Sequence, residues 1–204
     1  MTQPFDASAL LDCYRRGVFP MADSREDPRI FLFDPDMRGV LPLDGLHISR
    51  SLAKFMRRMT WDITYNAAFS DVIALCAESA PDRPSTWINH GIEHLYTGLH
   101  HMGHAHSVEV WEGEQLVGGL YGVSIGAAFF GESMVSRRTN ASKVALVKLV
   151  ARLNAAGYVL LDTQFITDHL QSLGGVEITR DEYQTRLKAA LVKKAEFTVD
   201  LKDA

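Results

Sequence analysis

The chain has 204 residues, of which 47% are hydrophobic and 23% are charged, and its formal net charge is −4. These values are typical of a globular protein with one sizeable core and room for a small extra lobe. The charge argues against a strongly basic nucleic-acid-binding protein, although a local basic patch remains compatible with it.

We expect neither a secretory signal peptide nor a membrane span. The N-terminus lacks the basic start and the apolar core of a signal peptide, and no apolar run approaches the ~20 residues of a membrane span. Cys13 and Cys76 form no CxxC pair, so a disulfide framework is not expected. A reduced cytoplasm is the simplest location for such a chain.

The first part of the chain is predicted to be a small N-terminal domain. Residues 7–16 fit a short helix, and a loop rich in proline and aspartate follows. The change in composition near residues 34–38 predicts a boundary, with a small domain over 1–37 and the main domain over 38–204. The smaller piece cannot hold a core alone, so it should pack on the rest.

Residues 47–59 predict an amphipathic helix. Apolar side chains recur at helical spacing, at Leu52, Phe55, Met56 and Met59. Basic side chains form a second face, at Arg50, Lys54, Arg57 and Arg58. A basic stripe of this kind usually faces solvent, and the alternative is contact with a nucleic-acid phosphate backbone.

The middle of the chain predicts a strand, two helices and a meander. The strand covers 61–67, and the helices cover 70–79, capped by Ser70 or Asp71, and 89–102. Three antiparallel strands follow within 106–134, and Gly113 and Gly126 mark their turns.

The last part predicts a long helix over 139–157, capped by Thr139 or Asn140, and a strand over 159–164. Because this helix connects two strands, those strands should pair in parallel. Two further helices are expected near 167–173 and 180–193. The fold class is therefore α+β, with a mixed sheet.

His90, Glu93 and His94 have the H-x-x-E-H spacing of some zinc peptidases. Gly91 weakens the helix there and no third ligand is evident, so we favour surface histidines on an amphipathic helix. The histidine-rich stretch 100–106 allows the same two interpretations, and again we favour the one without metal.

Two strands end in acidic side chains. VLLDTQ, residues 159–164, runs from apolar residues into Asp162 and Gln164, which share one face of a strand. Burying such a pair costs free energy unless hydrogen bonds compensate for it. Glu132 also ends an apolar strand, and the two acids together form a site hypothesis.

Arg137, Arg138 and Lys143 lie at the start of the long helix. Cations are unfavourable at a helix N-terminus, so this cluster suggests an anionic ligand.

Seven longer segments carry a more specific signal. They are YRRGVFPM (14–21), FDPDMRGVL (33–41), LHISRSL (46–52), TWINHGI (86–92), LHHMGHAHSVEVWEGEQLVGGLYGV (99–123), FGESMVSRRTNASKVAL (130–146) and LLDTQFITDHLQSLGG (160–175). In this order they cover most of the chain, and they resemble the bacterial leucyl/phenylalanyl-tRNA–protein transferases. This resemblance displaces the zinc-peptidase hypothesis.

The resemblance implies an enzyme that moves Leu or Phe, and less well Met, from aminoacyl-tRNA to the N-terminal amine of proteins beginning with Arg or Lys. The added residue marks those proteins for N-end rule degradation. It also implies an acetyltransferase-like (GNAT-like) main domain after a small N-terminal domain, with no metal or diffusible cofactor. We expect a cytoplasmic monomer without a membrane partner.

Residue roles follow from matching positions of the family. Asp162 and Gln164 match the proposed catalytic pair. The residues implied for the aminoacyl pocket are Leu120, Phe129, Leu149, Glu132 and Ser133. Those implied for the tRNA 3′ end are Tyr14, Met21 and Trp87. We expect the tRNA backbone to contact the two basic clusters, Arg50, Lys54, Arg57, Arg58, Arg137 and Arg138.

The chain departs from the family in four places. About 13 residues precede YRRGVFPM, where the family has a longer segment, and the tail AEFTVDLKDA lacks the usual aromatic ending. Met21 replaces a Trp, which weakens the expected stacking on the terminal adenosine. Leu149 replaces a Phe, which should widen the pocket.

The chemistry joins an activated ester to a free α-amine, whose pKa near 8 leaves a useful neutral fraction. We expect Asp162 to orient Gln164 and to stabilise the ammonium that forms on attack. The carbonyl oxygen of Gln164 would hold the amine, and Glu132 could hold an α-amino group. The proton would leave through water or a ribose hydroxyl.

Two rival functions remain. An acetyltransferase that uses acetyl-CoA would carry a glycine-rich loop before the long helix, but the corresponding segment, SRRTNASK, has no glycine. The other alternative is a non-catalytic protein that binds basic N-termini or tRNA. The intact DTQ and GES segments argue against it.

Overall fold

A mixed sheet forms the centre of the molecule in the computed structural model, which describes residues 5–79 and 85–198. Within these ranges the sheet has seven strands in the order β4-β5-β6-β7-β8-β3-β9. They are β3 (Met37–Val40), β4 (Asp62–Tyr65), β5 (Ala105–Glu112), β6 (Gln115–Ile125), β7 (Ala128–Ser136), β8 (Leu160–Gln164) and β9 (Val176–Thr179). All neighbours are antiparallel except β7 and β8. The predicted α+β class and the parallel pairing are confirmed.

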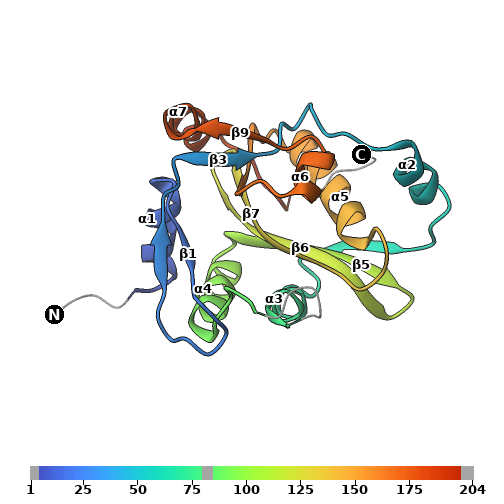
Figure 1. Cartoon of the computed structure of the whole chain (residues 1–204), viewed down its shortest axis with the longest axis horizontal. Helices are drawn as coiled ribbons and strands as arrows, with labels where there is room; N and C mark the ends of the chain where they lie inside the picture. The colour runs from blue at the N-terminus through green and yellow to red at the C-terminus, as the bar shows by residue number, and fades with distance from the viewer. Residues whose placement is uncertain (1–4, 80–84, 199–204) are drawn as a thin grey trace.

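Helices cover both faces of this sheet (Figure 1). One face packs against α3 (Phe69–Ala77) and α4 (His90–His101), and α1 (Ala7–Arg15) packs on α4. The other face carries α2 (Arg50–Met56), α5 (Ala141–Ala155) and α6 (Asp168–Ser172). Helix α7 (Arg180–Leu191) lies along β3 and β9, and its buried side chains share a core with α1, α3 and α4. Among the described residues, no helix is both long and apolar enough to cross a membrane.

The sheet separates two apolar cores. One contains Tyr14, Ile92 and Phe130, and the other contains Leu120 and Phe129. Neighbouring residues of β7 therefore point into different cores, as strand geometry requires. The long helix α5 connects β7 to β8 and supplies a larger share of the second core than any other element, which is why the parallel pair has a helix packed over it.

Four short strands were not predicted from the sequence. β1 (Phe19–Met21) and β2 (Phe31–Phe33) form a two-stranded antiparallel sheet within the expected N-terminal loop. β3 and β9, four residues each, extend the main sheet beside β8. Strands this short lack a readable alternation and depend on partners far along the chain.

Two predicted turns are confirmed and one predicted cap is wrong. Gly113 and Gly126 have φ of +60° and +58°, the left-handed conformation that favours glycine. Helix α3 begins after Ala68 rather than at Ser70 or Asp71, and no side chain caps it locally. The buried acid Glu109 of β5 lies beside this end of the helix, where its Oε1 accepts a bond of 3.5 Å from the N–H of the N-cap residue Ala68.

The predicted start of α5 is confirmed in position but not in mechanism. Asn140 is the N-cap residue, yet its φ is +73° and its side chain makes no capping bond. The Ser136 hydroxyl instead accepts a hydrogen bond from the N–H of Ser142, at 3.2 Å. Residues 1–4 and 199–204 lie outside the described residues. The expectations about the short N-terminal segment and the C-terminal tail fall partly on them.

Candidate active site

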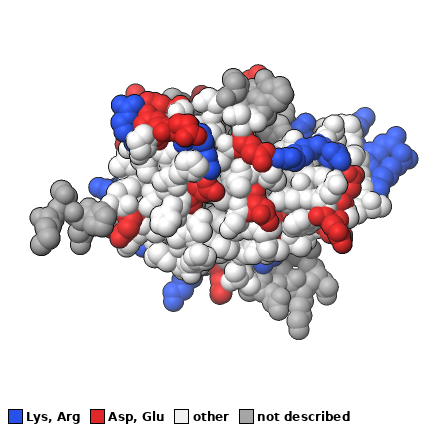
Figure 2. Space-filling view, turned by 90° about the horizontal axis from the view of Figure 1, so that it is seen from below, with Lys and Arg blue, Asp and Glu red and all other residues white. Residues whose placement is uncertain are grey.

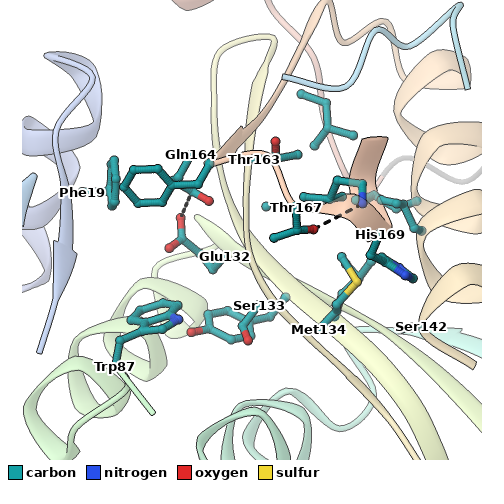
Figure 3. Close-up of a pocket in the computed structure, with 18 of the residues that line it drawn as sticks. Phe19, Trp87, Glu132, Ser133, Met134, Ser142, Thr163, Gln164, Thr167 and His169 are labelled. Carbon is teal, nitrogen blue, oxygen red and sulfur yellow. Dashed lines mark hydrogen bonds between the residues drawn. The ribbon is translucent and has the colours of Figure 1, made fainter. Parts of the chain in front are cut away.

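The pairing of β7 with β8 ends early and leaves room for a cavity. The two strands pair only from Ala128 to Phe130 and from Leu160 to Asp162. Beyond that point β7 continues beside β6, whereas β8 is joined to β3. A cavity of about 1050 Å³ lies there, lined by residues 131–134 of β7 and by the segment after β8 (Figure 3).

One arm of the cavity is apolar. Its wall comes from β6, β7, β8, α5 and α6, through Leu120, Met134, Leu146, Leu149, Leu161 and Leu170. Leu120 and Leu149, which were predicted for the aminoacyl pocket, are therefore on this wall. Ser142 and His169 lie at the same end in the close-up (Figure 3).

The other arm is aromatic and polar. Phe19 and Met21 come from β1, Trp87 precedes α4, and Phe165 follows β8. Figure 3 shows Phe19 and Trp87 on the same side as Glu132 and Gln164. Met21 and Trp87 thus line the cavity, as expected of residues near a bound 3′ end, and so do the predicted residues Glu132 and Ser133.

Glu132 is the most perturbed acid of the cavity. Its Oε2 accepts a hydrogen bond of 2.7 Å from Tyr96, and its Oε1 accepts one of 3.1 Å from Gln164. The hydroxyl of Tyr14 continues the chain of bonds at 2.6 Å from that of Tyr96. Burial, and to a smaller degree the charge of Asp162, raises the pKa of Glu132 to about 7. Glu132 can therefore exchange a proton near neutral pH.

Gln164 faces Glu132 from the end of β8. The bond to Glu132 uses the amide nitrogen of its side chain, which leaves the carbonyl oxygen as an acceptor. Its backbone has φ of +57°, an uncommon conformation for a residue with a side chain. The backbone N–H is held by Asp162 Oδ1 at 2.8 Å, which fixes this conformation. The predicted orienting role of Asp162 is thus consistent with the geometry.

Asp162 itself does not reach the cavity. It is 0% exposed, and its carboxylate accepts from Arg38 at 2.7 Å and 2.9 Å and from Tyr183 at 2.6 Å. These donors and the Gln164 N–H occupy the acceptor positions of both oxygens. Asp162 therefore makes no direct contact with the cavity, and its predicted stabilisation of the reacting ammonium stays a prediction. Its contacts are those of a buried structural acid.

Neither Arg38 nor Tyr183 was predicted to belong to this network, and Arg38 is its central residue. It is 1% exposed and lies between two rings, with its guanidinium carbon 4.5 Å from the centroid of Phe19 and 4.4 Å from that of Tyr183. It also donates to the Gly17 carbonyl at 2.8 Å. Arg38 therefore links the N-terminal hairpin, α7 and Asp162. In the sequence, the one sign of this role is an arginine within the short strand MRGV, residues 37–40.

Two predicted contact residues are buried behind the cavity wall. Tyr14 is 0% exposed and packs on Phe130 with ring centroids 4.9 Å apart, so it supports Tyr96 rather than facing a ligand. Phe129 is also 0% exposed and stacks on Phe197 at 5.5 Å. The expected direct contacts of Tyr14 with the tRNA end and of Phe129 with the aminoacyl side chain are wrong, because both rings are core residues.

The cluster before α5 is paired on the surface. Arg137 forms an ion pair with Glu78, and Arg138 forms one of 3.0 Å with Glu112. These acids supply the negative charge that the two arginines appeared to need, which removes the argument for a bound anion there. In the H-x-x-E-H segment, Glu93 forms an ion pair of 2.5 Å with Arg25.

The basic face of α2 is free of such pairs within the described part of the chain. Leu52 is buried and packs with Phe55 and Met56 against the second core, as predicted. The basic side chains are exposed, and they are Arg50, Lys54, Arg57 and Arg58. In Figure 2, Lys and Arg gather at the end of the molecule that α2 forms, whereas Asp and Glu predominate over the middle of that face.

Two family models match the chain. The model of the leucyl/phenylalanyl-tRNA protein transferase covers residues 40–188, and the model of the N-terminal domain of the same family covers residues 4–36. The division of the chain at residues 37 and 38 remains our proposal.

Relatives with the same family name are similar over nearly the whole chain. The leucyl/phenylalanyl-tRNA–protein transferase of Maricaulis maris is 60% identical over 194 residues, which cover 95% of this chain and 90% of that protein. The transferase of Phenylobacterium zucineum is 60% identical over 193 residues, covering 95% of this chain and 87% of that protein.

Solved structures give a more distant likeness. A ribosomal-protein-alanine N-acetyltransferase from Brucella melitensis has a TM-score of 0.38 at 14% identity, covering 55% of this chain and 87% of that one. An aminoglycoside acetyltransferase from a soil metagenome also has a TM-score of 0.38 at 14% identity, covering 70% and 97%.

Proposed function

The chain belongs to the leucyl/phenylalanyl-tRNA–protein transferase family, and on this basis we propose its substrates and its mechanism. It is an aminoacyltransferase that takes its aminoacyl group from tRNA and gives it to a protein. The proposed donors are Leu-tRNA and Phe-tRNA, and less well Met-tRNA. The proposed acceptors are cytoplasmic proteins beginning with Arg or Lys, which are thereby marked for N-end rule degradation.

The observation that carries this proposal is the single cavity with two unlike arms. An apolar arm adjoins a carboxyl–amide pair that can hold an amine, within one cavity of about 1050 Å³. A pocket lined by leucines disfavours polar side chains because it cannot replace their hydration. It separates Leu, Phe and Met only weakly, since one methylene is worth about 1–3 kcal/mol.

Leu149 and Leu120 are the proposed selectivity residues. Both lie on the apolar wall, Leu149 from α5 and Leu120 from β6. Because Leu is smaller than Phe, Leu149 leaves more space than the aromatic residue that the family usually has there. This supports acceptance of the larger Phe side chain as well as Leu.

Gln164 and Glu132 are the proposed residues at the reacting amine. The carbonyl oxygen of Gln164 accepts a hydrogen bond from the incoming α-amine, and Glu132 takes the proton that the amine loses on attack. A free α-amine has a pKa near 8, so a carboxylate with a pKa of about 7 is a suitable acceptor. Asp162 acts only through the backbone of Gln164.

The reaction balances with these groups alone. The amine nitrogen forms a bond to the ester carbonyl carbon, and its proton passes to Glu132. When the tetrahedral intermediate collapses, the bond from that carbon to the ribose oxygen breaks. Glu132 returns the proton to the ribose oxygen, which leaves as a hydroxyl. The new amide and the free tRNA are the products, and the carboxylate is regenerated.

The basic face of α2 is the proposed contact with the tRNA backbone. Phosphate contacts are independent of sequence and weaken with salt. Replacing Arg50, Lys54, Arg57 and Arg58 with Ala should weaken donor binding and flatten its dependence on salt, measured by titration of aminoacyl-tRNA. The matched control replaces the ion-paired Arg137 and Arg138, which should change the salt slope less. Equal slopes for the α2 variant and the wild type would contradict this assignment.

A transfer assay tests the function as a whole. Labelled Leu-tRNA or Phe-tRNA is mixed with a peptide beginning with Arg and, separately, with the same peptide beginning with Gly. We expect label in the first peptide only. Binding of tRNA or peptide without any transfer would favour the alternative, a non-catalytic binding protein, and equal labelling of both peptides would contradict the proposed acceptor class.

A further inference from the structure

The cavity wall carries negative but no positive side chains. Among the described residues that line it, the carboxylates are Glu132 and Asp168, and no Lys or Arg is present. A guanidinium or ammonium that leaves water for this cavity needs an anionic partner, because an unpaired charge is costly to desolvate. The basic side chain of the acceptor could therefore form an ion pair with either Glu132 or Asp168.

Glu132 is the less suitable of the two. Its oxygens already accept hydrogen bonds from Tyr96 and Gln164, and it is proposed to handle the proton of the α-amine. Since burial raises its pKa to about 7, it is only partly ionised at neutral pH. A group that must change its charge during the reaction is a poor permanent partner for a cation. Asp162 is excluded as well, because Arg38 neutralises it.

Asp168, unlike Glu132, is available as a permanent partner for a cation. It is exposed at the first turn of α6, and no described Lys or Arg forms an ion pair with it. Its carboxylate is not needed as a helix cap, because Thr167 Oγ1 accepts the capping bond from the Leu170 N–H. Figure 3 places Thr167 and His169, the neighbours of Asp168 in the chain, on the cavity wall.

Asp168 is also near the amine site along the chain. It follows Gln164 by four residues, so their Cα atoms are at most about 14 Å apart. An acceptor residue whose α-amine contacts Gln164 can therefore extend a long side chain toward Asp168. Short basic or neutral side chains would leave that carboxylate unpaired.

We propose that Asp168 binds the basic side chain of the acceptor's first residue and sets the preference for Arg and Lys. This inference rests on the proposed function, since it assigns a role in the same cavity. Charge, rather than shape, would then select the acceptor, while the apolar arm selects the donor side chain. Because Asp168 lies on α6 close to Leu170 of the apolar wall, the two selections would be made at neighbouring points of one cavity.

The test compares two acceptor peptides that differ only in their first residue, Lys or norleucine, which has a similar length but no charge. For Asp168→Asn we expect the Lys preference, as a ratio of kcat/KM, to fall by about fivefold, in the range of an exposed ion pair. The loss should appear in the KM for the Lys peptide, with kcat and the KM for Leu-tRNA nearly unchanged. Glu177→Gln, an exposed acid on β9 outside the cavity, is the matched control.

Two further variants make the result decisive. Asp168→Glu should keep most of the Lys preference, and Asp168→Lys should reduce use of the Lys peptide below that of the norleucine peptide. Unchanged preference in both Asp168→Asn and Asp168→Lys, with folding verified by thermal unfolding, would overturn the role of Asp168. Failure of the wild-type protein to transfer to either peptide would overturn the proposed function instead.

Discussion

Asp162 and Glu132 are carboxylates on adjacent strands, yet their surroundings give them different roles. Asp162 is buried against Arg38 and Tyr183, which hold its charge in place. Glu132 forms no ion pair among the described residues, and burial raises its pKa to about 7. The comparison teaches that a buried ion pair makes one acid structural, whereas burial with neutral hydrogen-bond partners makes the other able to exchange protons.

The largest expected effect comes from breaking the structural pair. Arg38→Met leaves the charge of Asp162 buried without a partner, so the free energy of unfolding should fall by about 3–5 kcal/mol. Urea unfolding measures this loss. Arg180→Ala is the control, because Arg180 pairs with Asp34 and Asp36 on the surface and should contribute at most about 1 kcal/mol.

A second variant separates charge from packing at this position. Replacing both partners, Arg38→Met with Asp162→Leu, removes the unpaired charge, so the double variant should be more stable than Arg38→Met alone. If Arg38→Met lowers the free energy of unfolding no more than Arg180→Ala does, Arg38 does not stabilise the charge of Asp162. Asp162 would then not be a structural acid, and its contrast with Glu132 would be contradicted.

The next effect concerns the functional acid. Glu132→Gln removes the proton acceptor but keeps a side chain of nearly the same shape, so kcat should fall by about 100-fold. Unfolding in urea should show no loss of stability at neutral pH. Glu114→Gln, an exposed acid at the turn between β5 and β6, should leave kcat unchanged. A Glu132→Gln enzyme with wild-type kcat would make Glu132 structural as well.

The pH dependence of stability sharpens the same contrast. Because the pKa of Glu132 is raised in the folded state, its contribution to stability is full below its usual pKa of 4.5 and is lost as the pH rises through about 7. Relative to Glu132→Gln, the wild-type protein should lose about 1–3 kcal/mol between about pH 5 and pH 8. Urea unfolding at both pH values measures the difference, and parallel curves would contradict the raised pKa.

The smallest effect separates the backbone of Gln164 from its side chain. Since its φ is +57°, Gln164→Ala keeps the strain of the left-handed conformation, whereas Gln164→Gly relieves it. The Gly variant should be more stable than the Ala variant by about 1 kcal/mol. Both should slow transfer by about tenfold, the loss of one hydrogen bond to the amine. A normal rate in either variant would remove the side chain from the mechanism.

Much of this arrangement could be predicted from the sequence, because it depends on local patterns. Periodicity located the long helix and the meander, and glycines located the turns at Gly113 and Gly126. The predicted parallel pairing of the strands on either side of the long helix, β7 and β8, then brought their ends together. This placed Glu132 near Gln164. The apolar wall residues Leu120 and Leu149 came from the family resemblance.

The rest depended on contacts that no local pattern records. Arg38 lies 124 residues from Asp162 in the chain, within a segment that resembled a loop, so their pairing could not be deduced. Because this pairing is not visible in the sequence, Asp162 was predicted to stabilise the reacting ammonium as well as to orient Gln164. Tyr14 and Phe129 were assigned to the cavity by position, but the side of the wall that each ring faces depends on packing across the sheet.

The most direct test of Glu132 as the proton acceptor is the pH dependence of single-turnover transfer in the wild type and in Glu132→Gln. Both enzymes share the titration of the acceptor amine, so the ratio of their rates isolates Glu132. We predict that this ratio rises with pH, with a midpoint at about 7, and levels off above it. A ratio that stays constant from about pH 5 to about pH 9 would contradict the account.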